Sequence, residues 1–139
     1  GVIGLIMRWY GTFPVKRDGD DRAALRTALN ILQNNLPLLI APEGTRHPEG
    51  LRDPQHGASF LAMKTGVPLI PVAISGTADI FSTLRKGRKQ KVDMVIGKSY
   101  NLPILPDTTR RDALRIHTDY IMQRIAELLP DRHRGIYKK

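Results

Sequence analysis

Residues 36–50 have the sequence LPLLIAPEGTRHPEG, in which a short apolar run is followed directly by charged and small residues. The run at 36–41 is bounded by asparagine and proline, which predicts a buried strand. Glu43, Gly44 and Arg46 then stand at its exit, where loops held by a rigid sheet face solvent and build sites. An arginine there offers donors matched to phosphate or carboxylate, and a glycine lets a ligand approach the backbone closely. Taken alone, the stretch also fits a surface turn that carries an ion pair.

The segments on either side predict alternating helices and strands. Asp18 to Asp21 indicate a turn and a helix start, and apolar residues then recur at helical spacing as far as the asparagines at 34 and 35. Residues 57–65 predict a short helix that Gly66 ends in a left-handed conformation. The segment VPLIPVAIS predicts a strand with Pro68 at its start and Pro71 at a bulge or edge.

The C-terminal part completes the same pattern. In KVDMVIG, residues 91–97, apolar and polar side chains alternate as in a half-exposed strand. Apolar residues at helical spacing then predict a helix from about Thr109 to Leu129, ended by Pro130. The fold class predicted is α/β, a single domain with a mixed, largely buried sheet flanked by helices.

Composition narrows the function classes. The chain of 139 residues has no cysteine, so it carries no disulfide framework and no thiolate metal site, and no apolar run is long enough to span a membrane. The net charge of +9 is concentrated after residue 80, where 14 lysines and arginines face 6 acids, most densely in LRKGRKQKV at 84–92. Such a segment suits an anionic membrane, acidic small molecules, nucleic acid or simply solvent. No aromatic residue stands among these basic residues as a base-stacking platform would, which disfavours nucleic acid as the partner.

A second stretch repeats the arrangement of the first. In GTFPVKRD, residues 11–18, the β-prone segment Phe13 to Val15 delivers Lys16 and Arg17 to its end. Two strand ends that each present an arginine predict one anion site, formed by Arg17 and Arg46, which would suit a phosphate-bearing substrate.

These blocks resemble those of the glycerolipid acyltransferases, the family of 1-acylglycerol-3-phosphate and lysophospholipid acyltransferases. APEGTR at 41–46 resembles the family's Phe-Pro-Glu-Gly-Thr-Arg block, and GTFPVKR at 11–17 is similar to its second block. VPLIPVAISGT resembles its fourth block, and HGASFLAMKTG resembles its Lys-x-Gly-Ala helix with Gln55 in place of the lysine. VDMVIGKSYNL is similar to a family strand that has proline where this chain has Ser99. The resemblance extends over essentially the whole chain and implies a glycerol-3-phosphate acyltransferase-like fold.

The resemblance implies transfer of a fatty acyl group from acyl-CoA or acyl carrier protein to a hydroxyl of a glycerophosphate or lysophospholipid acceptor. It assigns the acceptor's phosphate to Arg17 and Arg46, with Glu43, Gly44 and Thr45 shaping the pocket. The thioester is a substrate, so neither a cofactor nor a metal is expected. The partners implied are the two substrates and a membrane surface, with peripheral localisation at the cytoplasmic face.

The family's catalytic motif, His-x-x-x-x-Asp, is not found in this sequence. The four histidines are His47, His56, His117 and His133, and the residues five positions later are Arg52, Leu61, Met122 and Lys138. We therefore expect no catalytic residue within 1–139 and interpret the chain as the C-terminal portion of one acyltransferase domain, whose histidine and aspartate lie upstream and which is inactive by itself. A non-catalytic phospholipid-binding homologue and, less favoured, a basic nucleic-acid-binding module are the alternatives. His117 is expected on the apolar face of its helix with a satisfied ring nitrogen.

Overall fold

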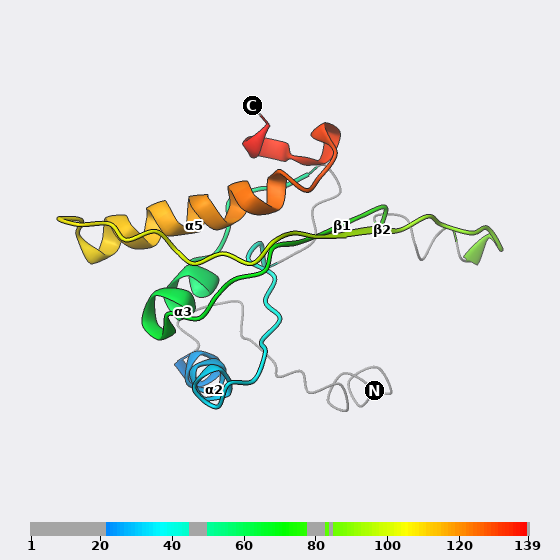
Figure 1. Cartoon of the computed structure of the whole chain (residues 1–139). Helices are drawn as coiled ribbons and strands as arrows, with labels where there is room; N and C mark the ends of the chain where they lie inside the picture. The colour runs from blue at the N-terminus through cyan, green and yellow to red at the C-terminus, as the bar shows by residue number, and fades with distance from the viewer. Residues whose placement is uncertain (1–21, 45–49, 78–82, 84, 139) are drawn as a thin grey trace. The chain divides into compact units, whose positions relative to one another are not determined.

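The computed structural model of the chain describes residues 22–44, 50–77, 83 and 85–138. The chain divides into two compact units, residues 1–39 and residues 40–139. Helix α2 (Arg22–Gln33) belongs to the first unit. The second contains, in chain order (Figure 1), α3 (Gly57–Thr65), β1 (Val72–Ser75), β2 (Asp93–Ile96), α5 (Arg110–Ala126) and the 3-10 turns η1 (Asp131–His133) and η2 (Gly135–Tyr137). Both helices and strands are therefore present, as predicted.

Helix α2 confirms the predicted amphipathic helix. Ala24 and Ala28 are buried on one face, while the helix start expected at Asp18 to Asp21 lies outside the described residues. At the other end, Asn35 has a φ of 57° and its N–H donates to the carbonyl of Leu32 at 3.0 Å. The N–H of Leu36 donates to the carbonyl of Ile31 at 3.1 Å. These two bonds form a Schellman motif, which ends the helix at the asparagine pair.

The buried strand predicted for residues 36–41 is wrong. The structure assigns no strand there, and Leu39 is 91% exposed. The helix end gives a physical reason, because the N–H of Leu36 is already bonded to α2 and Pro37 has no N–H. The first two residues of the run therefore cannot donate to a sheet, and no described strand pairs with the rest.

In the described part of the chain, the sheet consists of β1 and β2, paired antiparallel with Val72 opposite Ile96. Beyond this ladder an isolated bridge joins Leu69 to Tyr100. From the Val72–Ile96 pair to the Leu69–Tyr100 bridge, the segment before β1 spans three residues and the segment after β2 spans four. The extra residue forms a bulge opposite Pro71. This confirms the irregularity predicted at Pro71. Its carbonyl still accepts from the N–H of Gly97 at 2.9 Å.

The predicted burial of the sheet is not found in these strands. All four residues of β2 are exposed, including Met94 at 61% and Ile96 at 65%. Helix α5 packs against β1 (Figure 1), and only Ala73 of the described strand residues becomes buried. The alternating pattern of residues 91–97 was therefore a poor guide to burial, because burial depends on which elements cover a strand.

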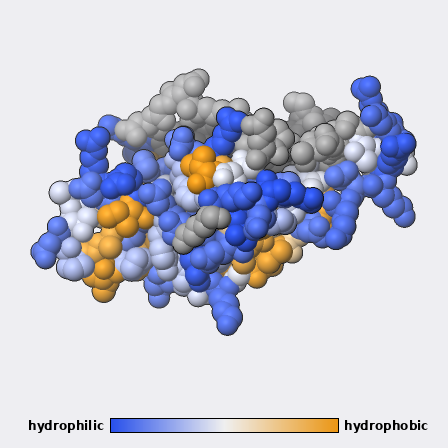
Figure 2. Space-filling view, turned by 90° about the horizontal axis from the view of Figure 1, so that it is seen from above, coloured by the Kyte–Doolittle hydropathy of each residue, from blue (hydrophilic) through white to orange (hydrophobic). Residues whose placement is uncertain are grey.

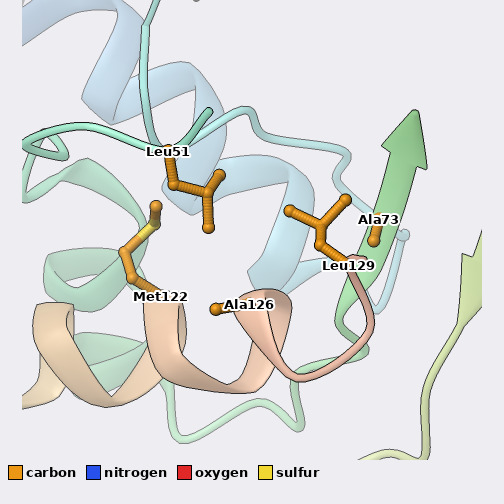
Figure 3. Packing of buried hydrophobic residues seen from close by; sticks show 5 residues of the cluster. All are labelled: Leu51, Ala73, Met122, Ala126 and Leu129. Carbon is orange, nitrogen blue, oxygen red and sulfur yellow. The ribbon is translucent and has the colours of Figure 1, made fainter. Parts of the chain in front are cut away.

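The core of the second unit gathers along α5. Met122 and Ala126 of this helix pack with Ala73, Leu129 and Leu51 (Figure 3), with Ile125, Leu128 and Tyr137 at the edge of the cluster. Helix α5 confirms the predicted C-terminal helix. The hydroxyl of Thr109 accepts from the N–H of Asp112 at 3.2 Å and caps its first turn.

Helix α3 is tied to α5 by side-chain hydrogen bonds. His56, at the N-cap of α3, lies 2.9 Å through Nδ1 from the Thr118 hydroxyl of α5. The buried Ser59 hydroxyl lies 2.6 Å from the same oxygen. The predicted end of α3 is confirmed, since Gly66 has a φ of 67° and its N–H donates to the Ala62 carbonyl. These contacts fix the segment that follows the candidate site.

Candidate functional site

The described part of the predicted site is the turn at residues 41–44. The N–H of Gly44 donates to the Ala41 carbonyl at 3.2 Å, and Gly44 adopts a φ of 66°. Glu43 is half-buried and Gly44 is exposed. The other predicted site residues, Arg17, Thr45 and Arg46, lie outside the described residues, as do Lys16 and His47.

Gln55 holds this turn in place. Its N–H donates to the Pro42 carbonyl at 2.7 Å, and its Cγ would lie 3.5 Å from a Cβ added to Gly44. The residue that replaces the lysine of the resembled helix motif therefore contacts the predicted site directly. Its role here is to support the backbone of the turn.

Tyr137, near the C-terminal end of the chain, is close enough to Glu43 for the carboxylate to affect its pKa. Burial raises the pKa of Tyr137 to about 12, and the carboxylates of Asp119 and Asp53, a hydrogen bond with Asp119 and the carboxylate of Glu43 add to the increase. The phenol is therefore protonated at neutral pH. The negative charge of Glu43 is thus felt at the Tyr137 phenol, as the last of these contributions.

Tyr137, Asp53 and Asp119 were not among the predicted site residues. Long-range packing brings the segment of Tyr137 to Leu51, because the backbone of Leu51 pairs with residues 133–136 through two hydrogen bonds. The Leu51 N–H donates to the His133 carbonyl at 3.2 Å, and the Ile136 N–H donates to the Leu51 carbonyl at 3.1 Å. No local motif around Tyr137 carries this information.

This arrangement limits the chemistry of the described edge. A carboxylate repels a phosphate, so the Glu43 side chain by itself does not favour an anion. Acids and a phenol instead suit the hydroxyl groups of a ligand, which both donate and accept hydrogen bonds. Among the described residues, no group of three or more histidine, cysteine, aspartate or glutamate side chains is placed to hold a metal.

The described histidines have different surroundings. His56 bonds to Thr118, and His133 accepts a hydrogen bond from Arg132 at 3.1 Å. The satisfied ring nitrogen predicted for His117 is not Nδ1, because this buried atom has no hydrogen-bond partner among the described residues. Burial lowers the pKa of His117, so the ring is neutral at neutral pH.

Comparison with known proteins identifies the class. A family model described as Acyltransferase matches residues 1–75, which include the turn at 41–44 and strand β1. The chain belongs to this acyltransferase family, and its curated relatives are of the glycerolipid type. No solved structure matches the chain.

The relatives carry one enzyme name. The chain is 36% identical over 90 residues to a chloroplastic 1-acyl-sn-glycerol-3-phosphate acyltransferase of Brassica napus, covering 62% of this chain and 26% of that protein. It is 27% identical over 126 residues to the 1-acyl-sn-glycerol-3-phosphate acyltransferase of Bacillus subtilis, covering 91% and 61%. To the human beta enzyme of that name it is 34% identical over 90 residues, covering 62% and 32%. The chain thus spans about a quarter to three fifths of the length of these relatives.

Proposed function

We propose that this chain forms the acceptor-binding part of a glycerolipid acyltransferase. The reaction would move a fatty acyl group from acyl-CoA or acyl carrier protein to a hydroxyl of a lysophospholipid or glycerol phosphate. The observation that carries the proposal is the family match over residues 1–75, together with the single enzyme name of the relatives. Because none of its histidines is followed by aspartate five positions later, we expect the chain by itself to bind the acceptor without transferring acyl groups.

In this proposal, the head group of the acceptor is divided between two kinds of side chain. Arg17 and Arg46 bind the phosphate, since guanidinium donors match its oxygens. The carboxylate of Glu43 repels a phosphate, so a glycerol hydroxyl faces this side chain instead. Gly44 and Thr45 complete the wall of the pocket.

Binding of a short lysophosphatidate tests this proposal. A six-carbon acyl chain keeps the probe monomeric, and calorimetry of the 139-residue chain gives its affinity. We expect Arg46→Ala and Arg17→Ala each to weaken binding about tenfold or more, because each loses a charge-assisted contact of roughly 1.5–3 kcal/mol. The corresponding monoacylglycerol, which lacks the phosphate, should bind weakly to every variant.

Arg115→Ala is the matched control, because Arg115 is an exposed arginine of α5 outside the proposed site. It should bind the probe as the unchanged chain does. Equal affinities in Arg17→Ala, Arg46→Ala and Arg115→Ala would show that the phosphate assignment is wrong.

We also propose that the chain contacts an anionic membrane surface. Val72, Ile74, Met94 and Ile96 share one face of the β1–β2 ladder by register, and the basic residues at 85–91 precede β2. Figure 2 shows a mainly hydrophilic face of the molecule interrupted by separate hydrophobic patches. Among the described residues no helix has the length and apolar character that crossing a bilayer requires.

Co-sedimentation with anionic vesicles tests this membrane contact. The bound fraction of the chain should fall steeply as salt rises, and salt-independent binding would count against an electrostatic contact.

A further inference from the structure

One face of the β1–β2 hairpin is apolar and lies open to solvent. Ala73 packs into the core beside α5, so the alternate residues of both strands lie on the opposite face by register. With one further step at each strand, this outer face consists of Ile70, Val72, Ile74, Val92, Met94 and Ile96. Five of these six side chains are exposed, Met94 at 61% and Ile96 at 65%. Within the ladder, no charged or polar side chain interrupts the outer face.

The basic residues at 85–91 follow directly from the end of this ladder. The side-chain amide of Gln90 donates to the Gly76 carbonyl at 3.0 Å, and a Cβ added to Gly76 would overlap the Lys91 carbonyl. The two segments thus remain side by side beyond the last ladder pair, which joins Ser75 to Asp93. The apolar face and the cationic segment therefore belong to one continuous hairpin.

The charge of the hairpin selects the kind of partner. A contiguous exposed apolar face marks an interface, whereas single exposed apolar side chains are common. A second copy of the chain would carry the same net charge of +9 and would be repelled. Aliphatic side chains next to several cations match a bilayer with anionic head groups, because its acyl region accepts such side chains without a specific shape. The cations of this segment are all exposed: Arg85, Lys86, Arg88, Lys89 and Lys91.

We propose that the outer face of the β1–β2 hairpin inserts into an anionic bilayer, while residues 85–91 contact the lipid head groups. This inference rests on the membrane contact proposed above and specifies which face enters the lipid. Helix α5 packs on the opposite face of β1, so it would lie on the side away from the bilayer. Apolar burial and the attraction of the cations both contribute to binding, and salt weakens chiefly the second.

Fluorescence at a single introduced cysteine tests the insertion, because the chain has no cysteine of its own. An environment-sensitive dye is attached to Met94→Cys on the outer face, or to Gln123→Cys at an exposed position of α5. With vesicles of phosphatidylcholine and about 30% phosphatidylserine, the dye at 94 should shift to the blue and be quenched by brominated lipid. The dye at 123 should remain as in water. Equal responses at the two positions, or a bound chain whose dye at 94 stays in water, would overturn the proposal.

Neutral polar substitutions separate insertion from the electrostatic contact. Met94→Gln combined with Ile96→Gln should weaken vesicle binding about tenfold or more at constant charge, because two apolar side chains no longer enter the lipid. Both positions are exposed, so thermal unfolding should show an intact fold. Ile116→Gln, at an exposed isoleucine of α5, is the matched control and should bind as the unchanged chain does.

The outcomes of these experiments are distinct. If the double variant binds vesicles with full affinity, the membrane contact stands but the insertion is wrong. Absence of vesicle binding by the unchanged chain would reject both. A blue shift at 94 that appears without vesicles and grows with chain concentration would assign the outer face to a second copy instead.

Discussion

Thr118 is the residue whose hydroxyl connects α3 to α5. Its oxygen lies within hydrogen-bonding distance of His56 Nδ1, the Ser59 hydroxyl and the Leu114 carbonyl, at 2.9, 2.6 and 2.7 Å. The Ser59 hydroxyl is also 2.9 Å from the His56 carbonyl. The hydroxyls of Thr118 and Ser59 supply two protons for three oxygen–oxygen contacts. When Thr118 donates its proton to the Ser59 hydroxyl or to the Leu114 carbonyl, its oxygen accepts from His56, so the His56 ring carries its proton on Nδ1.

Thr118→Val should therefore destabilise the chain by about 1–3 kcal/mol. The substitution keeps the shape but leaves the buried Ser59 hydroxyl short of a partner and releases His56. Urea unfolding measures the loss. Thr27→Val is the matched control, because Thr27 makes the same type of bond to a carbonyl four residues earlier on an exposed helix face, and it should change stability by less than about 0.5 kcal/mol. Equal effects of both substitutions would mean that the network between the helices contributes nothing.

At the scale of elements, the segment η1–η2 is held by backbone pairing with Leu51. Gly135 makes this approach possible, since its φ is 53° and an added Cβ would overlap the backbone of Leu51. The same pairing holds the segment of Tyr137, whose pKa is raised in part by the charges of Asp119, Asp53 and Glu43. The candidate site therefore depends on one glycine far away in the sequence.

Gly135→Ala should destabilise the chain by about 3 kcal/mol or more, because a methyl group meets backbone that cannot move aside. Gly66→Ala provides a control with the same backbone conformation, since Gly66 has a φ of 67° and nothing lies within 4 Å of an added Cβ. That substitution should cost only about 1 kcal/mol, the strain of a left-handed alanine. Thermal unfolding compares the two, and spectroscopic titration should find the pKa of Tyr137 lower in Gly135→Ala. If both variants lose the same stability, Gly135 is no more than a turn residue.

Local signals explain which elements the sequence could predict. Helix α5 has a capping threonine and apolar residues at helical spacing, and α3 has a glycine at its end, so both followed from neighbouring residues. The prediction of a strand at 36–41 was wrong because the N–H of Leu36 donates to the Ile31 carbonyl at the end of α2 and is not free to pair in a sheet. Of the candidate site, the turn with Glu43 and Gly44 was found by motif. Tyr137 was not, because only tertiary pairing brings it there.

For the whole molecule, three titrating side chains define a pH range of highest stability. Burial lowers the pKa of His117, so the unfolded chain binds more protons there and stability falls as pH drops below about 6.5. On the alkaline side the pKa of Tyr100 is raised to about 12, first by burial and then by Tyr120, with an opposing effect of Arg124. The pKa of Tyr137 is also raised to about 12.

The folded chain thus retains two phenolic protons that the unfolded chain loses near pH 10. Stability from these tyrosines is complete below pH 10 and is lost as pH rises toward 12. After allowance for solvent screening, the loss should be about 0.5 kcal/mol per pH unit for each tyrosine. Urea unfolding from pH 5 to 11.5 measures both flanks. Tyr137→Phe should halve the alkaline slope and leave the acid flank unchanged, whereas His117→Phe should flatten the acid flank alone. The alkaline slope should not persist in a variant with both Tyr100→Phe and Tyr137→Phe. If it does, the loss of stability at high pH comes from the ionisation of lysines, and the double variant thus separates the effect of two buried phenols from that of a net charge of +9.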